Sequence, residues 1–327
     1  MKRVAVVGIV LVLAVVSAGA QNLSQVQDDL STFLGGLGSD VLGQLQQNAL
    51  LGQGIGDAQL GDFPHMYFTL DTGAVFTKGI ATIVDKGTYQ VLNMPGIVND
   101  ALSGINSSTV TNLYNSTRSF FLYPHARLSF GFGIVDGFEV LGQIAYWPQA
   151  LSDAILTGAT ANFFNAGLRI RKVLLADSGP FPALSVGAGY VYSSFNLGYN
   201  LSKVGALTFS PITLDFSASK ISLGATLHTA GIDLTVSKRL LVFVPYLTFS
   251  SWYQWGSYDA SLSDLSVTIV PTTNSISPLS HGETGGLSFL ISGGFAVKLG
   301  AFVLTLGGSY NPATNVPAAE AALGAQF

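Results

Sequence analysis

The sequence predicts a transmembrane antiparallel β-barrel of about ten strands, with a short N-terminal helical segment. Three observations predict it. Stretches of about ten to eighteen residues alternate apolar with small or polar side chains, the composition is apolar without a long apolar run, and the connections alternate between short and long. Strands that cross a bilayer need about nine to eleven residues, whereas those of globular sheets average five or six.

The clearest strand pattern is Gly285–Leu299. Its odd positions include Leu287, Phe289, Ile291 and Phe295, whereas its even positions are mostly Gly, Ser and Ala. Because side chains alternate between the two faces of a strand, one face of this stretch is apolar and the other is small and polar. The length and the two-faced character together favour a strand with lipid on one side.

The composition excludes several other classes. Hydrophobic residues make up 48% of the chain, charged residues only 10%, and mean hydropathy is +0.46. A soluble domain carries about 25% charged residues, and a helical membrane protein shows apolar runs of about twenty residues. After the N-terminus the nearest such run is Leu240–Trp255, which Pro245 interrupts.

The first residues resemble a secretory leader. Lys2 and Arg3 precede the apolar run Val4–Val16, and a small-residue cleavage site ends at Ala20. We therefore expect residues 1–20 to be a signal peptide and the mature chain to begin at Gln21. Without Lys2 and Arg3, 12 basic residues face 18 acidic ones, a net charge of −6 that gives no case for nucleic-acid binding. The absence of cysteine excludes a disulfide framework.

Residues 63–327 are expected to form the barrel. The ten predicted strands are Phe63–Thr77, Arg118–Ile134, Phe138–Trp147, Ala161–Leu174, Ala183–Tyr199, Ile221–Val236, Leu241–Tyr258, Gly285–Leu299, Phe302–Asn311 and a last strand ending at Phe327. The count could lie between eight and fourteen, because Thr88–Asn93 and Leu207–Ser217 are further strand candidates.

Two local details of these strands can be predicted. A three-residue hairpin at Val135–Gly137, with Gly137 left-handed, would pair Phe132 with Val140 and keep the apolar faces together. Within Ile221–Val236 the apolar positions change parity, which predicts a β-bulge near Thr229–Gly231.

The connections assign the two ends of the barrel. Short turns alternate with long loops rich in Asn, Ser and Thr, and aromatic residues gather near the long loops, as at Tyr146, Trp147 and Trp255. Short periplasmic turns, long external loops and aromatic girdles are typical of outer-membrane barrels. An even number of strands then places both termini on the periplasmic side.

The segment 21–62 has a different pattern. Apolar residues recur at helical spacing, and Gly35, Gly36 and Gly38 are expected to divide them into two amphipathic helices, followed by a flexible tether at Gly52–Gly61. The segment holds five acidic residues and no basic residue, whereas the inward barrel faces carry Arg and Lys. We therefore expect it to plug the lumen or its periplasmic mouth. A helical extension below the barrel is the alternative.

Inward-facing charged residues are the best candidate site. They are expected to line the lumen, and the candidates are Arg127, Glu139, Arg169, Arg171, Lys298, His125 and Asp71. They could bind an anionic group or set ion selectivity. They could also pair with one another and with the aspartates of the plug, which is the interpretation we favour. No catalytic motif and no metal-ligand spacing is present, so the sequence predicts neither an enzyme, nor a cofactor, nor a metal site.

Taken together, the leader, the alternating strands, the aromatic girdles and the C-terminal Phe327 resemble bacterial outer-membrane β-barrel proteins. Ala321, Leu323 and Ala325 precede Phe327 at the alternate spacing that, in that family, the assembly machinery recognises. In plan, the plugged barrel is similar to the long-chain fatty-acid transporters, which are longer.

The resemblance implies an outer-membrane location, contact with membrane lipid, and a channel or transporter for small, possibly hydrophobic, molecules. The alternative is a structural or surface-interaction protein with a closed lumen.

Overall fold

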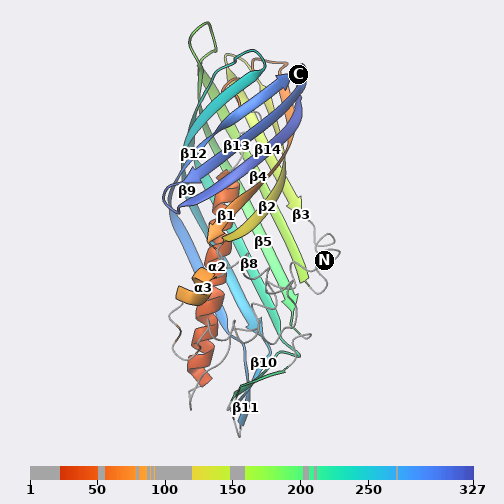
Figure 1. Ribbon diagram of the computed structural model, residues 1–327, viewed down its shortest axis with the longest axis vertical. Helices are drawn as coiled ribbons and strands as arrows, with labels where there is room; N and C mark the ends of the chain where they lie inside the picture. Colours follow the sequence, from red (N-terminus) through yellow and green to blue (C-terminus); the bar gives the residue numbers. More distant parts are fainter. Residues whose placement is uncertain are drawn as a thin grey trace.

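A computed structural model shows a closed barrel of ten antiparallel strands in the order β1-β14-β13-β12-β9-β8-β5-β4-β3-β2 (Figure 1). The structure describes residues 23–50, 56–78, 81–86, 89, 92, 120–147, 159–201, 206–209, 212–269 and 272–327. The expected signal peptide lies outside these residues, so its prediction stays open.

The barrel strands are β1 (Met66–Lys78), β2 (Phe120–Gly133), β3 (Phe138–Trp147), β4 (Ala159–Leu175), β5 (Ala183–Asn200), β8 (Lys220–Ser237), β9 (Phe243–Ser263), β12 (Leu279–Leu299), β13 (Phe302–Asn311) and β14 (Val316–Gln326). The remaining elements are the helices α2 (Leu23–Leu50) and α3 (Ala81–Lys86), and four short strands β6 (Ala206–Phe209), β7 (Ile212–Asp215), β10 (Leu265–Ile269) and β11 (Thr272–Ile276). Among the described residues, no helix combines the length and the hydropathy needed to cross a membrane.

The prediction of ten strands is confirmed, but the wall is taller on one side than expected. Strands β5, β8, β9 and β12 have 18 to 21 residues, whereas β3 and β13 have 10. β12 begins at Leu279, six positions before the predicted start at Gly285. The tall strands extend toward the long-loop end, where β10 and β11 lie (Figure 1).

The candidate strand Leu207–Ser217 lies outside the barrel. It forms the hairpin of β6 and β7, which joins β10 and β11 in a separate sheet of order β11-β10-β7-β6. These strands belong to two different long connections, β5 to β8 and β9 to β12. Most of the other candidate, Thr88–Asn93, lies outside the described residues.

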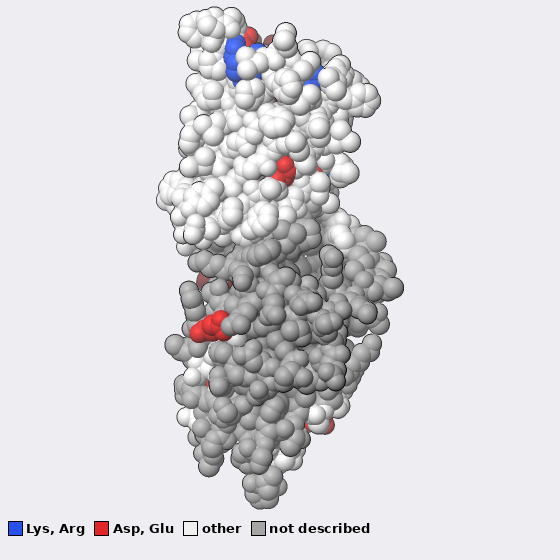
Figure 2. Space-filling model, in the orientation of Figure 1, with Lys and Arg blue, Asp and Glu red and all other residues white. Residues whose placement is uncertain are grey.

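The outer face of the barrel is apolar over a limited height. On β12 the outward apolar positions run from Leu287 to Leu299, about 40 Å along the strand and about 28 Å at a tilt of 45°. That height matches the apolar band of outer-membrane barrels. On the face shown in Figure 2, charged side chains are sparse on this wall and gather at the short-turn rim.

An aromatic cluster marks the outer edge of this band. The imidazole of His228 stacks on the indole of Trp255 at 5.4 Å between centroids, and Tyr190 and Tyr192 lie beside it. Beyond the cluster the outward positions of β8 become polar, beginning with Thr226. The tall strands therefore project past the membrane on the long-loop side.

The predicted hairpin at Val135–Gly137 is confirmed. Gly137 is left-handed with φ of 70°, and Asp136 also has a positive φ of 53°. Phe132 pairs with Val140. The apolar faces of β2 and β3 therefore stay in register.

The predicted β-bulge near Thr229–Gly231 is wrong. β8 pairs with β5 and with β9 in continuous register throughout its length. Ile221, Leu223, Ala225 and Leu227 all point inward, whereas Ile232 and Leu234 point outward. The parity of the apolar residues changes along β8 because its environment changes. In the half nearer the long loops the inward residues pack on α2, whereas in the half nearer the short turns the outward residues face lipid.

The predicted division of residues 21–62 into two helices is also wrong. α2 is continuous from Leu23 to Leu50. Its glycines lie where the helix meets neighbouring groups, because a Cβ at Gly38 would lie 2.0 Å from the ring of Tyr258 and a Cβ at Gly36 would lie 2.7 Å from Ile83. Glycine costs about 1 kcal/mol in a helix interior, and the close packing offsets this cost.

Candidate functional site: the lumen and the chain inside it

The first half of α2 packs in an apolar core at the long-loop end. Val26, Leu30, Phe33 and Leu34 are buried there against the inner faces of the tall strands and the separate sheet of β6, β7, β10 and β11, which we call the loop sheet. The partners in that core include Leu214, Phe216, Ile221, Leu223, Leu262, Leu265, Val267 and Ile276. The helix therefore begins outside the apolar band of the barrel.

The second half of α2 descends into the lumen. Leu42 and Leu45 pack on the inward residues Ala225 and Leu227 of β8. Further along, the Nε2 of Gln254 donates to the carbonyl of Gln46 at 3.3 Å. These contacts place successive residues of α2 along the inner wall, closer to the short-turn end as the helix proceeds.

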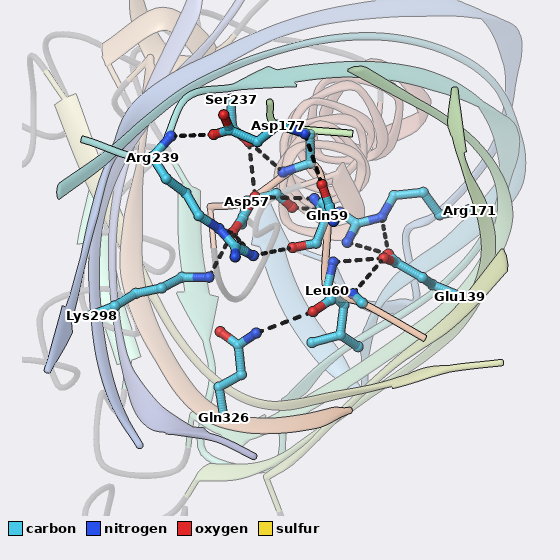
Figure 3. Close-up of polar contacts among 12 residues, drawn as sticks. Asp57, Gln59, Leu60, Glu139, Arg171, Asp177, Ser237, Arg239, Lys298 and Gln326 are labelled. Atoms are coloured by element: carbon cyan, nitrogen blue, oxygen red, sulfur yellow. Dashed lines mark hydrogen bonds and ion pairs between the residues drawn. The ribbon is translucent and has the colours of Figure 1, made fainter. Parts of the chain in front are cut away.

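After the helix, residues 56–62 cross the short-turn half of the lumen, and we call them the lumen strap. Asp57 is its central residue (Figure 3). Its Oδ2 accepts from Lys298 Nζ at 2.6 Å and from Arg239 Nη2 at 3.1 Å, and its Oδ1 accepts from Ser237 Oγ at 2.9 Å. The positive charges of Lys298 and Arg239 compensate for the burial of the Asp57 carboxylate.

A second buried ion pair holds the other side of the strap. The Nε of Arg171 donates to Glu139 Oε2 at 2.6 Å, and both side chains are fully buried. Glu139 Oε1 accepts from the backbone N–H of Leu60 at 2.6 Å, and Arg171 Nη1 donates to the carbonyl of Asp57 at 2.7 Å. Each member of the pair therefore bonds both to its partner and to the strap backbone, as Figure 3 shows.

The strap is also connected to the short turns that follow β4 and β8. Asp177 accepts from Lys238 Nζ at 2.5 Å and from the backbone N–H of Arg239 at 2.6 Å. These two hydrogen bonds hold the pKa of Asp177 below its usual range. Gln59 accepts from the N–H of Asp177 at 3.0 Å. The expected flexible tether at Gly52–Gly61 is therefore a fixed segment in its described part, residues 56–61.

The lumen at the middle of the wall is filled by side chains. Arg127 pairs with Asp71 at 3.2 Å, and Arg169 pairs with Asp233 at 3.2 Å and lies over the ring of Trp252. A cavity of about 20 Å³ remains here, enough for about one water molecule.

The inward glycines at the strap and at the middle of the wall leave no open space, whereas a Cβ at Gly286, nearer the long loops, would meet no atom within 4 Å. A Cβ at Gly131 would lie 2.1 Å from the ring of Tyr67, and one at Gly133 would lie 1.7 Å from the carbonyl oxygen of Gly61. Large side chains from neighbouring strands and the strap itself occupy the volume that these glycines free. The lumen of this barrel is therefore narrow at the strap and at the middle of the wall.

The sequence-predicted site residues fall into two groups. Glu139, Arg171 and Lys298 meet at the strap, whereas Asp71, Arg127 and Arg169 lie in the ion pairs at the middle of the wall. For His125 the structure gives the backbone position, opposite Gly73 of β1.

Three strap or lumen partners were missed by the sequence reasoning: Ser237, Arg239 and Asp233. Asp57 was expected only as one of five acidic residues of segment 21–62 that could pair with inward basic residues, and not as the central one. Asp57 and Arg239 were assigned to a tether and a turn, where charged residues are usually solvated. The one available signal was the excess of acidic residues in segment 21–62, which required basic partners.

Among the described residues, no three His, Cys, Asp or Glu side chains gather closely enough to hold a metal ion.

The closed barrel with its apolar outer band defines a bacterial outer-membrane β-barrel protein. No family model matches the chain, and no curated protein is significantly similar to it in sequence.

Solved structures that resemble it include the outer membrane protease OmpT from Escherichia coli, at 10% identity and a TM-score of 0.42, covering 81% of this chain and 97% of that one. The translocator domain of the autotransporter NalP from Neisseria meningitidis has 9% identity and a TM-score of 0.38, covering 91% and 99%. Ail, the attachment invasion locus protein of Yersinia pestis, has 8% identity and a TM-score of 0.24, covering 80% and 98%. Similarity at this level carries no information about activity, and the resemblance to fatty-acid transporters stays a hypothesis.

Proposed function

We propose that this protein is a surface-interaction protein of the outer membrane with a closed lumen. The observation that carries the proposal is the occupation of the lumen at two levels. The strap is bonded to the wall at the short-turn end, and ion pairs and Trp252 fill the middle.

The interacting part would be an external module made of the first half of α2, the loop sheet β6, β7, β10 and β11, and the projecting ends of the tall strands. Its core is continuous and apolar, so the loops that bear the sheet are held in a defined shape. Ordered external loops on a rigid barrel are a suitable platform for a partner, because less conformational entropy is lost on binding.

Transport of small, possibly hydrophobic, molecules is the function that the sequence favoured. It would require both release of the strap and displacement of the ion pairs and Trp252 that fill the middle of the wall. The hydrogen bonds of Asp57 and Glu139 oppose that release.

The proposal includes no catalytic role and no cofactor. Lipid would surround the apolar band. Phe327 would be recognised by the outer-membrane assembly machinery, and its position supports this role. Its backbone N–H donates to Met66 at 2.9 Å while its side chain is exposed.

Planar-bilayer recording with purified protein tests the closed lumen. The wild-type protein should be silent. Deletion of residues 23–61 combined with Arg169→Ala and Trp252→Ala, which removes the strap and also side chains that fill the middle, should produce steady conductance. Deletion of the β10–β11 hairpin (residues 265–276) is the matched control and should remain silent. Steady wild-type conductance would contradict the closed lumen and favour the channel.

The interaction role is tested on cells that produce the protein. We expect wild-type cells to adhere to surfaces coated with matrix protein, mucin or polysaccharide, and cells with the hairpin deletion to adhere less. Equal adhesion of the two strains to every coat would contradict the interaction role.

A further inference from the structure

The chain runs through the barrel in one direction. The first turn of α2 belongs to the long-loop end, because Leu23 and Val26 pack in the apolar core that includes Leu214 of β7 and Val267 of β10. The strap ends at the opposite mouth. There Asp62 Oδ1 accepts from the N–H of Gly137 at 2.9 Å, in the turn between β2 and β3.

The wall closes around this path. β1 pairs with both β14 and β2, and the hydrogen-bonded circuit has no free edge. The deep end of α2 and the strap touch inward side chains such as Gln254, Glu139 and Lys298. The segment therefore passes through the lumen and does not go around the outside of the wall.

We propose that the barrel carries its own N-terminal segment through the lumen and presents the first turns of α2 on the outer surface of the cell. This reverses the expectation, drawn from the even number of strands, that both termini lie on the periplasmic side. That expectation holds for the ends of the barrel itself, since β1 begins and β14 ends at the short-turn mouth. A peptide joined ahead of Leu23 would be displayed outside.

The segment is suited to this passage. Residues 23–61 contain no proline, no cysteine and no basic side chain. Its apolar residues Leu30, Phe33 and Leu34 reach their buried positions only at the long-loop end. Burial of that apolar face favours the threaded state, and no external energy source is needed to hold it there. The strap then fixes the other end of the segment.

Because the chain has no cysteine, single substitutions can report the side of the membrane. Ser24→Cys and Thr32→Cys replace exposed residues of α2. Asn274→Cys on β11 marks the long-loop side, and Ser178→Cys in the turn between β4 and β5 marks the short-turn side. Intact cells that produce each full-length variant are treated with a membrane-impermeant maleimide, before and after permeabilisation.

We expect Ser24→Cys and Thr32→Cys to label on intact cells to the same extent as Asn274→Cys, while Ser178→Cys labels only after permeabilisation. Heat-modifiable gel migration confirms that each variant is folded. If the two helix positions label only after permeabilisation, as Ser178→Cys does, the proposal is overturned. Labelling only after denaturation also overturns it, because both positions are exposed in the structure.

A cross-link tests the position of the helix in the same cells. A Cβ built at Gly35 would lie 3.8 Å from the Cβ of Ser280 on β12, which is the usual separation in a disulfide. The variant Gly35→Cys/Ser280→Cys should therefore form an intramolecular disulfide on mild oxidation, and Gly43→Cys/Ser280→Cys should not. Failure of the first pair to cross-link in the folded barrel would contradict the threaded path. This inference goes beyond the proposed function. It is tested by labelling and cross-linking, whereas the closed lumen is tested by conductance, so the failure of one can be distinguished from the failure of the other.

Discussion

Lys298 Nζ lies 2.6 Å from Asp57 Oδ2, although the two residues are 241 positions apart in the sequence. The contact joins the lumen strap to the last residues of β12. Asp57 is almost completely buried, and Lys298 is mostly buried. The pair therefore links the N-terminal segment to the barrel wall at the short-turn mouth.

The substitution Asp57→Asn should release the strap. It leaves Lys298 without its buried counterion, and loss of one member of a buried pair costs about 3 kcal/mol or more. We expect amide hydrogen exchange at Ala58 and Leu60 to accelerate about 100-fold. These amides donate to Ser237 and Glu139 in the closed state. Asp136→Asn, in an exposed turn at the same end, is the control and should leave both amides protected.

The substitution Glu139→Gln should destabilise the barrel as well as the strap. The side chain of Arg171 is fully buried and would lose the carboxylate that neutralises it, at a cost of about 3–5 kcal/mol. We expect a lower urea midpoint for the loss of heat-modifiable migration. Glu283→Gln, at an exposed carboxylate, should have no effect. An unchanged midpoint for Glu139→Gln would show that the hydrogen bonds from Arg171 to the strap are enough to keep the barrel stable without the carboxylate.

Acid should weaken the short turns that follow β4 and β8 through Asp177. Its pKa in the folded protein lies below the ordinary value of 3.8, so its contribution to stability is present above pH 3.8 and is lost as the pH falls through the folded pKa. We expect the midpoint temperature of thermal unfolding to decrease when the pH is lowered below 3.8. Lys238→Ala should make this decrease smaller. Lys172→Ala removes a lysine that donates to the backbone carbonyl of Asp136 and not to Asp177, and should keep the wild-type pH profile.

Phe33→Ala tests the external module. Phe33 is buried in the apolar core at the long-loop end, and removal of a buried phenylalanine ring costs about 3–5 kcal/mol. We expect faster protease cleavage within the loop sheet on whole cells, while heat-modifiable migration stays unchanged. Thr32→Ala, at the neighbouring exposed position, is the control. If Phe33→Ala abolishes heat-modifiable migration together with the protease resistance of the loop sheet, the barrel and the module do not unfold separately.

The strands could be predicted from the sequence because lipid imposes a simple pattern on them. Every outward position between the aromatic cluster and the short turns meets hydrocarbon, so alternation alone located β3 and β13 to the residue. The pattern failed where the environment changed along one strand. On β8 the inward face meets α2 as far as Leu227 and polar lumen beyond it, and a single sequence cannot distinguish this change from a bulge.

The candidate site was predictable only in part, because its central residue belongs to a segment without periodicity. Arg171 and Lys298 were found through strand parity, which places them inward. Asp57 has no such signal, since it lies in a glycine-rich stretch between helix and strand. The same limitation affects the direction of α2, because its amphipathic pattern fits a helix that begins at either mouth of the barrel.

The position of the outer membrane boundary can be tested with two matched substitutions to arginine. Ile291 points outward from the middle of β12 and is expected to face hydrocarbon, where arginine costs about 2–4 kcal/mol. Thr226 also points outward, but it lies on the projecting part of β8 beyond the His228 cluster. We therefore expect Ile291→Arg to reduce folding yield into vesicles and Thr226→Arg to leave it unchanged. Equal folding of both variants would show that hydrocarbon does not cover this wall, and equal loss would show that the membrane reaches past the aromatic cluster onto the tall strands.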